Sequence, residues 1–512
     1  MELEIEKQSI SVVKTVYEGE IKSCADGSII VPDSKPDILK VCEVTAEPYF
    51  TEKLIEDGKI TLKGKVRINI LYIPDGEEKG LKSINGSMEF CETLKRSEFK
   101  EDMSLCAFCD VDRISYKVLN SRKIGIDTKI VMSVSVFANE QKELVSGVTA
   151  DNAQTKSKEL KFTGKQDYEE FSFFIDEEVE FPQGKCAEDL LKLDACITSK
   201  ECRALDGKLV IKGKLGICIL YEDCDKKYNH LDCEIPFTEV FDAPALTEDE
   251  DCEVSYEIRE TAYELKNNQQ GTSSLLVKAE IAVGLKTDED SAVSVLSDCY
   301  FTDADCNFSY EKAEMQEVSE QVKFSAVIKQ LLQKAEGCPD IAGVYKVQAK
   351  PGITETAITD GKLIVSGKIL MYVLYLTDDD ETPIASITEE VPFSYTIDCD
   401  SKLSADSRAV LGVECEHISY TISSKDAVEV RCGLMISGEI INVFEENVIS
   451  DITAQQRENG KNGIVVYFVK EGDSLWDIAK NYHIKTDSIL SANGKEEDGK
   501  LSAGEKLIIP ID

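Results

Sequence analysis

Histidine and tryptophan are the scarcest residues in this 512-residue chain, which has three histidines and one tryptophan. A Cys-His hydrolase needs an imidazole base close to its thiolate, yet no recognisable nucleophile motif neighbours His230, His417 or His483. The chain also lacks a phosphate loop of the GxxxxGK[ST] kind. No carboxylate stands in the apolar setting typical of glycoside cleavage, although 97 acidic residues are present. We therefore expect no catalytic residue and no cofactor, and we predict that the protein is not an enzyme.

Long hydrophobic runs are absent too. No stretch of 18 apolar residues occurs, so we expect no membrane insertion. The first residues hold neither the apolar core nor the basic leader of a secretory signal, so we expect a protein that is not exported. Basic residues are outnumbered 58 to 97, which gives a net charge of −39. Such a field repels phosphate backbones, so nucleic acid and anionic membranes are not expected as partners, whereas basic protein surfaces are favoured.

One stretch of sixteen residues occurs three times. DGKITLKGKVRINILY runs over 57–72, DGKLVIKGKLGICILY over 206–221 and DGKLIVSGKILMYVLY over 360–375. Seven columns are identical in all three copies, which start 149 and 154 residues apart, so each copy belongs to a whole domain. Asp-Gly predicts a hairpin turn of type I′, and the alternating residues that follow predict a half-buried strand. A glycine at one interior column (Gly64, Gly213 and Gly367) predicts a bulge or bend.

Aromatic residues also recur at fixed columns of the predicted strands. The columns are Tyr72, Tyr221 and Tyr375; Phe90, Phe237 and Phe393; and Tyr116, Tyr263 and Tyr420. Large apolar groups at fixed strand positions predict core residues, with a shared binding platform as the alternative.

The cysteines follow no such columns. Cys218 stands where the other repeats have Asn69 and Tyr372, and Cys91 stands where they have Thr238 and Ser394. A disulfide framework or metal site common to the repeats would reuse columns, so we expect all 18 cysteines to be thiols in a reducing compartment, with no metal site. Cys106 and Cys109 form a lone CxxC, for which redox chemistry and a purely structural role are both open. No second pair completes a zinc site.

The repeats and the changes in composition predict five segments. These are β repeats at 1–151, 152–300 and 301–452, a flexible linker at 453–463, and a separate module at 464–512. The polar stretches 152–165 and 301–321 are expected to be joints between the repeats. We therefore predict a mainly β protein of three tandem β-sandwich-like domains and a small C-terminal βααβ module.

The C-terminal segment has helical spacing that the repeats lack. Ser474 predicts an N-cap, with Asp477 three residues on in capping-box position. A second short helix over 487–492 is predicted to stop at Asn493-Gly494. This segment resembles a LysM module, and the residues that carry the resemblance are Gly472, Asp473, Ser474, Leu475, Ile478, Ala479, Tyr482, Leu490, Asn493, Leu501, Gly504, Leu507, Ile509 and Pro510.

The LysM resemblance implies a shallow groove for N-acetylglucosamine polymers between two loops. Carried over, the groove residues are Gly472, Asp473, Ser474, Leu475, Trp476, Ala492, Asn493, Gly494 and Lys495. For Trp476, support of the module core and stacking on a ligand are both open. Glu496, Glu497 and Asp498 form an acidic rim beside the groove. This rim suits a basic protein surface better than peptidoglycan, whose stem peptides are themselves acidic; a plain solvated loop is the third alternative.

The three large repeats are similar to the SPOCS domain of sporulating Firmicutes. Three such repeats followed by one LysM resemble the layout of the clostridial spore-coat morphogenetic proteins. The resemblance implies a non-enzymatic scaffold or adaptor in endospore coat assembly, which tethers coat layers to the forespore surface through protein–protein binding by the LysM domain and the β repeats. It also implies location in the mother-cell cytoplasm with recruitment to the forespore surface, and the basal spore-coat ATPase scaffold as partner. Self-association is possible. The alternative is a peptidoglycan-binding protein that anchors to cortex or cell wall.

Overall fold

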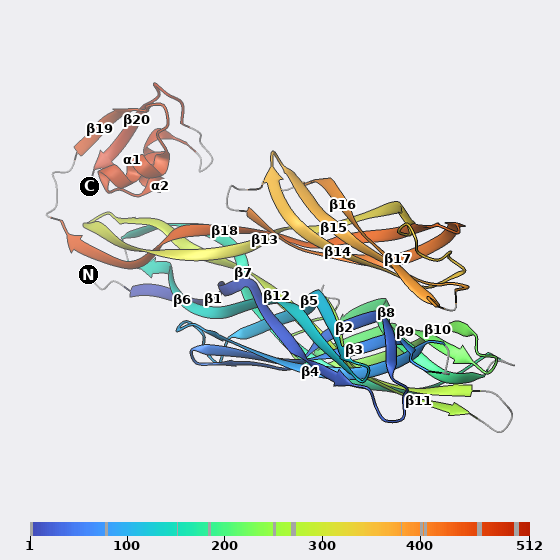
Figure 1. Cartoon of the computed structure of the whole chain (residues 1–512). Coiled ribbons are helices and arrows are strands. Elements are labelled where there is room, and N and C mark those ends of the chain that lie inside the picture. The colour runs from blue at the N-terminus through green and yellow to red at the C-terminus, as the bar shows by residue number, and fades with distance from the viewer. Residues whose placement is uncertain are drawn as a thin grey trace.

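The computed structural model describes residues 4–76, 80–150, 152–182, 186–248, 252–267, 273–379, 381–399, 403, 407–457, 463–495 and 501–511. The described chain is mainly β, with two short helices in its C-terminal module (Figure 1). This confirms the predicted fold class.

Each repeat has six strands among its described residues. In the first they are β1 (Glu4–Ile30), β2 (Ile38–Glu56), β3 (Lys59–Pro74), β4 (Lys82–Lys95), β5 (Ser104–Asn120) and β6 (Lys123–Thr149). In the second they are β7 (Ala153–Glu180), β8 (Ala187–Leu205), β9 (Lys208–Asp223), β10 (Tyr228–Asp242), β11 (Glu253–Asn267) and β12 (Ser273–Phe301). In the third they are β13 (Ala304–Gln333), β14 (Gly343–Thr359), β15 (Lys362–Leu376), β16 (Ile384–Asp398), β17 (Ser407–Ser424) and β18 (Ala427–Gln456).

The six strands of a repeat form two antiparallel three-stranded sheets. In the first repeat the orders are β2-β3-β4 and β1-β6-β5, and the other two repeats have the same pattern. One apolar cluster per repeat draws on both sheets, as in a β-sandwich. The repeated sixteen-residue stretch is the middle strand of the first sheet (β3, β9 and β15) together with the turn before it. In that turn, Asp360 and Gly361 both have positive φ, whereas in the first two repeats only the glycine does.

The glycine column makes room for a ring. Gly64 pairs directly with Phe90 on the neighbouring strand, and a Cβ at Gly64 would overlap the Phe90 ring and the Tyr49 carbonyl. Gly213 and Gly367 lie in the same way against Phe237 and Phe393. The irregularity predicted at this column is on the partner strand, where the register shifts after Phe50. The glycine is therefore required by ring packing.

Two of the three aromatic columns are core residues, as predicted. The Tyr72 and Phe90 columns are buried in all three repeats. The prediction is wrong for Tyr116 and Tyr420, which are 47% and 42% exposed. Both lie near the ends of the edge strands β5 and β17, where one side of the sheet has no neighbouring strand. Large apolar groups there are only partly covered.

The long outer strands continue past the sandwiches as two-stranded arms. The arm of the first repeat pairs 4–15 with 137–149, that of the second pairs 153–165 with 289–301, and that of the third pairs 304–318 with 441–456. The stretches expected to be joints are therefore strands. The three arms share two apolar clusters, to which every repeat contributes side chains, and they converge at one end of the molecule (Figure 1).

Equivalent residues of the repeats also meet between the sandwiches. Leu71, Leu220 and Leu374 occupy the same column and lie in one buried cluster. In each sheet this leucine pairs in register with a charged residue: Glu43, Lys192 or Lys346. The three repeats therefore pack around a common axis on which the same strand position of each is buried.

Charged side chains at this axis form ion pairs and a hydrogen bond between different repeats. Lys192 lies 3.3 Å from Glu43, Lys346 lies 2.7 Å from Asp194, and Tyr372 donates to Glu43. Burial raises the pKa of Glu43, against the effect of Lys192. Burial would also raise the pKa of Asp194, but Lys192 and Lys346 outweigh it and hold that pKa below its usual range. Buried pairs of this kind stabilise little on balance, but removing one partner is costly.

The C-terminal module contains β19 (Gly463–Phe468), α1 (Leu475–Tyr482), α2 (Thr486–Asn493) and β20 (Lys506–Ile511), and β19 pairs with β20. The segment predicted as a linker begins inside β18, because residues 453–456 pair with 304–307 at the tip of the third arm. In the part of the chain that the structure describes, no helix is long and apolar enough to cross a membrane.

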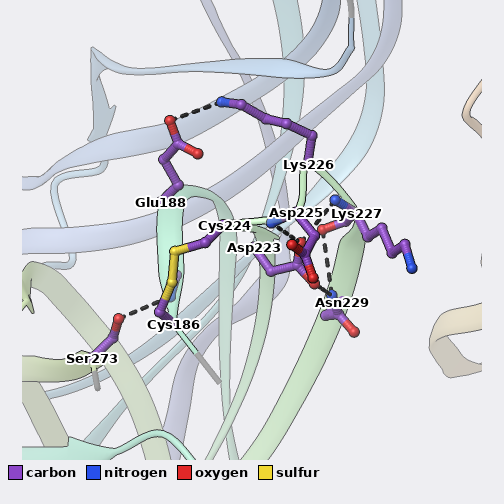
Figure 2. Close-up of a disulfide and its surroundings, with 10 residues drawn as sticks. Cys186, Glu188, Asp223, Cys224, Asp225, Lys226, Lys227, Asn229 and Ser273 are labelled. Carbon is purple, nitrogen blue, oxygen red and sulfur yellow. Dashed lines mark hydrogen bonds and ion pairs between the residues drawn. A yellow bond between two sulfur atoms is a disulfide. The ribbon is translucent and has the colours of Figure 1, made fainter. Parts of the chain in front are cut away.

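The prediction of eighteen thiols is wrong for one pair. A disulfide joins Cys186, just before β8, to Cys224 in the turn between β9 and β10 (Figure 2). The equivalent residues of the first repeat are Asp37 and Asp75, whose backbones hydrogen-bond at 2.8 Å. The fold thus brings these two columns together, although only the second repeat places cysteines there.

Cys106 and Cys109 lie three residues apart on β5, so their side chains project from opposite faces of the sheet. Burial raises the pKa of the Cys106 thiol to about 11 and that of Cys109 further still. Their geometry supports the structural interpretation of this CxxC.

Candidate functional site

The first predicted groove loop is held by hydrogen bonds within the C-terminal module. Ser474 caps α1 by accepting a hydrogen bond from the Asp477 N–H at 3.1 Å, as the capping box predicts. Asp473 Oδ2 accepts from the Lys470 N–H at 2.8 Å and from the Tyr467 hydroxyl at 2.7 Å. These bonds lower the pKa of the Asp473 carboxyl. Leu475 packs against the module core. Gly472 is exposed, with its φ at 89°.

The second loop follows α2, which ends at Asn493 with Gly494 as its left-handed cap. The Asn493 amide donates to the carbonyls of Ile489 and Ile508 and accepts from the Ile508 N–H, all within 2.8 Å. Lys495 pairs with Glu505 at 2.5 Å, and this bond lowers the pKa of Glu505. Among the nine predicted groove residues, the side chains of Asp473, Ser474, Asn493 and Lys495 are thus bonded inside the module. Ala492 and Gly494 are exposed. The acidic rim of Glu496, Glu497 and Asp498 lies outside the described residues.

Trp476 faces the repeats. Its indole Nε1 donates to Asp298 Oδ2 at 2.8 Å, and its ring lies edge-on to Tyr300 with the centroids 5.0 Å apart. Tyr300 is buried and donates its hydroxyl proton to the Ile484 carbonyl at 2.8 Å. Trp476 is also one of the half-buried residues packed against the module core, which is one of its two predicted roles. In addition it joins the module to the arm of the second repeat, a contact that neither predicted role included.

Lys480 on α1 and His483, the left-handed C-cap of that helix, complete the contact. Lys480 donates to Asp298 Oδ1 at 2.6 Å and lies 5.4 Å from the centroid of the Phe308 ring. His483 donates through Nδ1 to the Phe301 carbonyl at 2.9 Å. Positions 476 and 480 follow helical spacing, so one stripe of the α1 surface, together with the C-cap residue His483, docks on the tips of the second and third arms. Figure 1 shows the module at that end of the molecule.

The opposite side of the module is apolar and open to solvent. Alternate residues of β19 point outward, and Ile464, Val466 and Phe468 are 73%, 46% and 62% exposed. Ile508 of β20, which pairs with Val466, is 37% exposed. We call these four residues the outer face. The helices lie between this sheet and the arms, so the outer face points away from the repeats (Figure 1).

Comparison with known families bears on both parts of the chain. A family model described as SipL, SPOCS domain matches residues 37–119, 186–266 and 340–423. A model described as LysM domain matches residues 467–510. The chain therefore carries three SPOCS domain repeats and a C-terminal LysM domain. Searches of the curated proteins and of the solved structures find no match.

The SPOCS matches begin close to β2, β8 and β14 and end near the close of β5, β11 and β17. They leave out the long strands that build the arms and the middle of each second sheet, so the folded unit is larger than the matched region. SPOCS and LysM are non-catalytic binding domains, and this combination fits a sporulation-related adaptor with a peptidoglycan-binding module.

Proposed function

We propose that this SPOCS–LysM protein is a non-enzymatic adaptor of endospore coat assembly. In this proposal it works in the mother-cell cytoplasm, is recruited to the forespore surface and tethers coat layers there. Its partner is the basal spore-coat ATPase scaffold, which it binds as a protein through the LysM domain.

The outer face carries this proposal. Monomeric soluble proteins seldom leave large apolar side chains side by side in water, and where they do the patch is commonly an interaction site. Here three alternate residues of one strand and a cross-strand neighbour are exposed together. The docking stripe on α1 fixes the domain at the end of the arms, so this face is held outward.

The groove gives less support to sugar binding as the main activity. Its one aromatic side chain, Trp476, contacts Asp298 and Tyr300. Its polar side chains are bonded within the domain, which leaves Gly472, Ala492 and Gly494 as its exposed residues. Peptidoglycan binding is the second candidate function, since the LysM family match favours it and these exposed residues can still offer backbone groups.

The test is binding of the purified full chain to the purified coat ATPase. Phe468→Glu places a charge in the outer face, so we expect affinity to fall at least tenfold, as for the loss of a central apolar contact. Phe174→Glu is the matched control, because Phe174 is 74% exposed on β7 of the second repeat. If the wild-type chain and the Phe468→Glu variant bind the ATPase with equal affinity, the outer face is not the binding site.

A further inference from the structure

Three pairs of cysteines lie in sulfur–sulfur contact without a bond. Cys415 and Cys432 are 2.6 Å apart at Sγ, Cys299 and Cys306 are 3.7 Å apart, and Cys202 and Cys252 are 3.9 Å apart. None repeats the columns of the Cys186–Cys224 disulfide, and no function described above uses them.

The partners of each pair come from different strands or segments. Cys415 and Cys432 lie on the neighbouring strands β17 and β18 of the third repeat. Cys202 lies on β8, and Cys252 immediately precedes β11 of the same repeat. Cys299 lies near the end of β12 and Cys306 near the start of β13, so this pair spans the boundary between the second and third repeats. All three contacts lie within one chain, so closing them would stiffen the body without joining molecules.

The Cys299–Cys306 pair lies under the LysM domain. Cys299 stands between Asp298 and Tyr300, which hold Trp476, and Cys306 follows Asp305, whose carboxylate lies 3.6 Å from His483 Nε2. A covalent link there would tie together the two strands on which the LysM domain docks.

We propose that these three pairs are oxidation sites that close into intrachain disulfides, and that closure of Cys299–Cys306 fixes the platform under the LysM domain. The oxidant is a peroxide. It converts one thiol to a sulfenic acid and releases water. The partner thiol then attacks that sulfur, the S–S bond forms and a second water leaves. The two thiols lose two protons and two electrons, which the peroxide takes up.

The surroundings of Cys306 favour the first step there. It is partly exposed, whereas Cys299 is buried. The hydrogen bond with Cys299 lowers the pKa of the Cys306 thiol, and Lys480 adds to this effect against burial. A thiolate is the form that reacts with peroxide. By contrast, Cys106 and Cys109 have raised pKa values and point to opposite faces, so they should not pair.

The experiment takes the full chain with Cys186–Cys224 bonded and the other sixteen cysteines as thiols. It treats this chain with hydrogen peroxide, blocks the remaining thiols by alkylation and maps them by mass spectrometry. Three new disulfides would take six of the sixteen cysteines outside Cys186–Cys224 and leave ten alkylated, Cys106 and Cys109 among them. Trypsin leaves Cys299 and Cys306 in one peptide, which should be two hydrogens lighter and unalkylated. Disulfides between other cysteines or between chains, or thiols that all stay alkylatable, would overturn the proposal.

Variants separate the pairs. Cys306→Ser and Cys415→Ser replace partly exposed residues, and each should abolish only its own link. For the platform, the emission of Trp476, the sole tryptophan, is followed in urea. Oxidised wild-type chain should keep its native emission to higher urea than reduced chain, and Cys306→Ser should remove that difference. If oxidation shifts both chains equally, the Cys299–Cys306 link does not fix the platform.

Discussion

Removal of the Asp298 carboxylate should release the LysM domain from the arms. Asp298 Oδ1 and Oδ2 accept hydrogen bonds from Lys480 and from the Trp476 indole. A hydrogen bond to a charged group contributes about 1.5 to 3 kcal/mol when well buried, and an exposed ion pair about 0 to 1 kcal/mol. The Asp298 side chain is 25% exposed, so we expect Asp298→Ala to weaken docking by about 2 kcal/mol, roughly 30-fold.

Trp476 itself reports the result. Undocking exposes the indole to water, so its emission should shift to longer wavelength at lower urea in Asp298→Ala than in the wild-type chain. Asp176→Ala is the control, because Asp176 pairs with Lys278 at 3.1 Å on the sandwich of the second repeat. Trp476→Phe keeps the ring but lacks the N–H, so a double-mutant cycle with Asp298→Ala, followed by proteolysis at the 457–463 segment, should show coupling of about 1 kcal/mol or more. Additive effects, or an unchanged Trp476 emission in Asp298→Ala, would refute the docking contact.

Two other changes probe the body of the molecule. Lys192→Ala leaves the buried Glu43 carboxylate without its 3.3 Å partner, so the free energy of unfolding should fall by about 3 to 5 kcal/mol; Lys200→Ala, at an exposed pair, should lower it by at most about 1 kcal/mol. Gly367→Ala would force a Cβ into the Phe393 ring and should lower the free energy of unfolding by about 1 to 3 kcal/mol. Gly352→Ala, where a Cβ meets open space, should leave it nearly unchanged. Denaturant unfolding measures the free energy of unfolding of all four variants. Equal losses for the two lysine variants, or for the two glycine variants, would contradict the packing described.

Much of the fold could be predicted from local pattern. The triplicated stretch indicated three β domains, because alternation and Asp-Gly turns are properties of one strand and its neighbour. The LysM helices were predicted nearly to the residue, since Ser474 and Gly494 act on the backbone beside them.

The predictions that failed concern features that depend on packing between distant segments. The polar stretches taken as joints are arm strands, because their apolar residues are covered only when three arms meet. Glu43, Lys192 and Lys346 share one column. The sequence of a single repeat does not reveal that this column is buried at the axis between the three repeats. The Cys186–Cys224 disulfide was missed because only cysteine columns shared between the repeats were considered. The fold brings the two columns together in the first repeat as well, where they hold Asp37 and Asp75.

The candidate site was predicted in part. The start of α1 and the end of α2, beside which the two predicted groove loops lie, are where the sequence pattern places them. The role of Trp476 depends on Asp298, which lies 178 residues away in sequence. The alternating Ile464, Val466 and Phe468 could have indicated the outer face, because β19 is apolar on both sides. The helical spacing of Trp476 and Lys480 was a second signal that went unused.

The central claim is that the LysM domain of this chain binds a protein in preference to glycan. The most direct measurement places the purified full chain with the coat ATPase and, separately, with peptidoglycan sacculi, at the same concentration and ionic strength. We expect a saturable complex with the ATPase that Phe468→Glu weakens, and little sedimentation with sacculi. Saturable sedimentation with sacculi, unchanged by Phe468→Glu and without an ATPase complex, would contradict it.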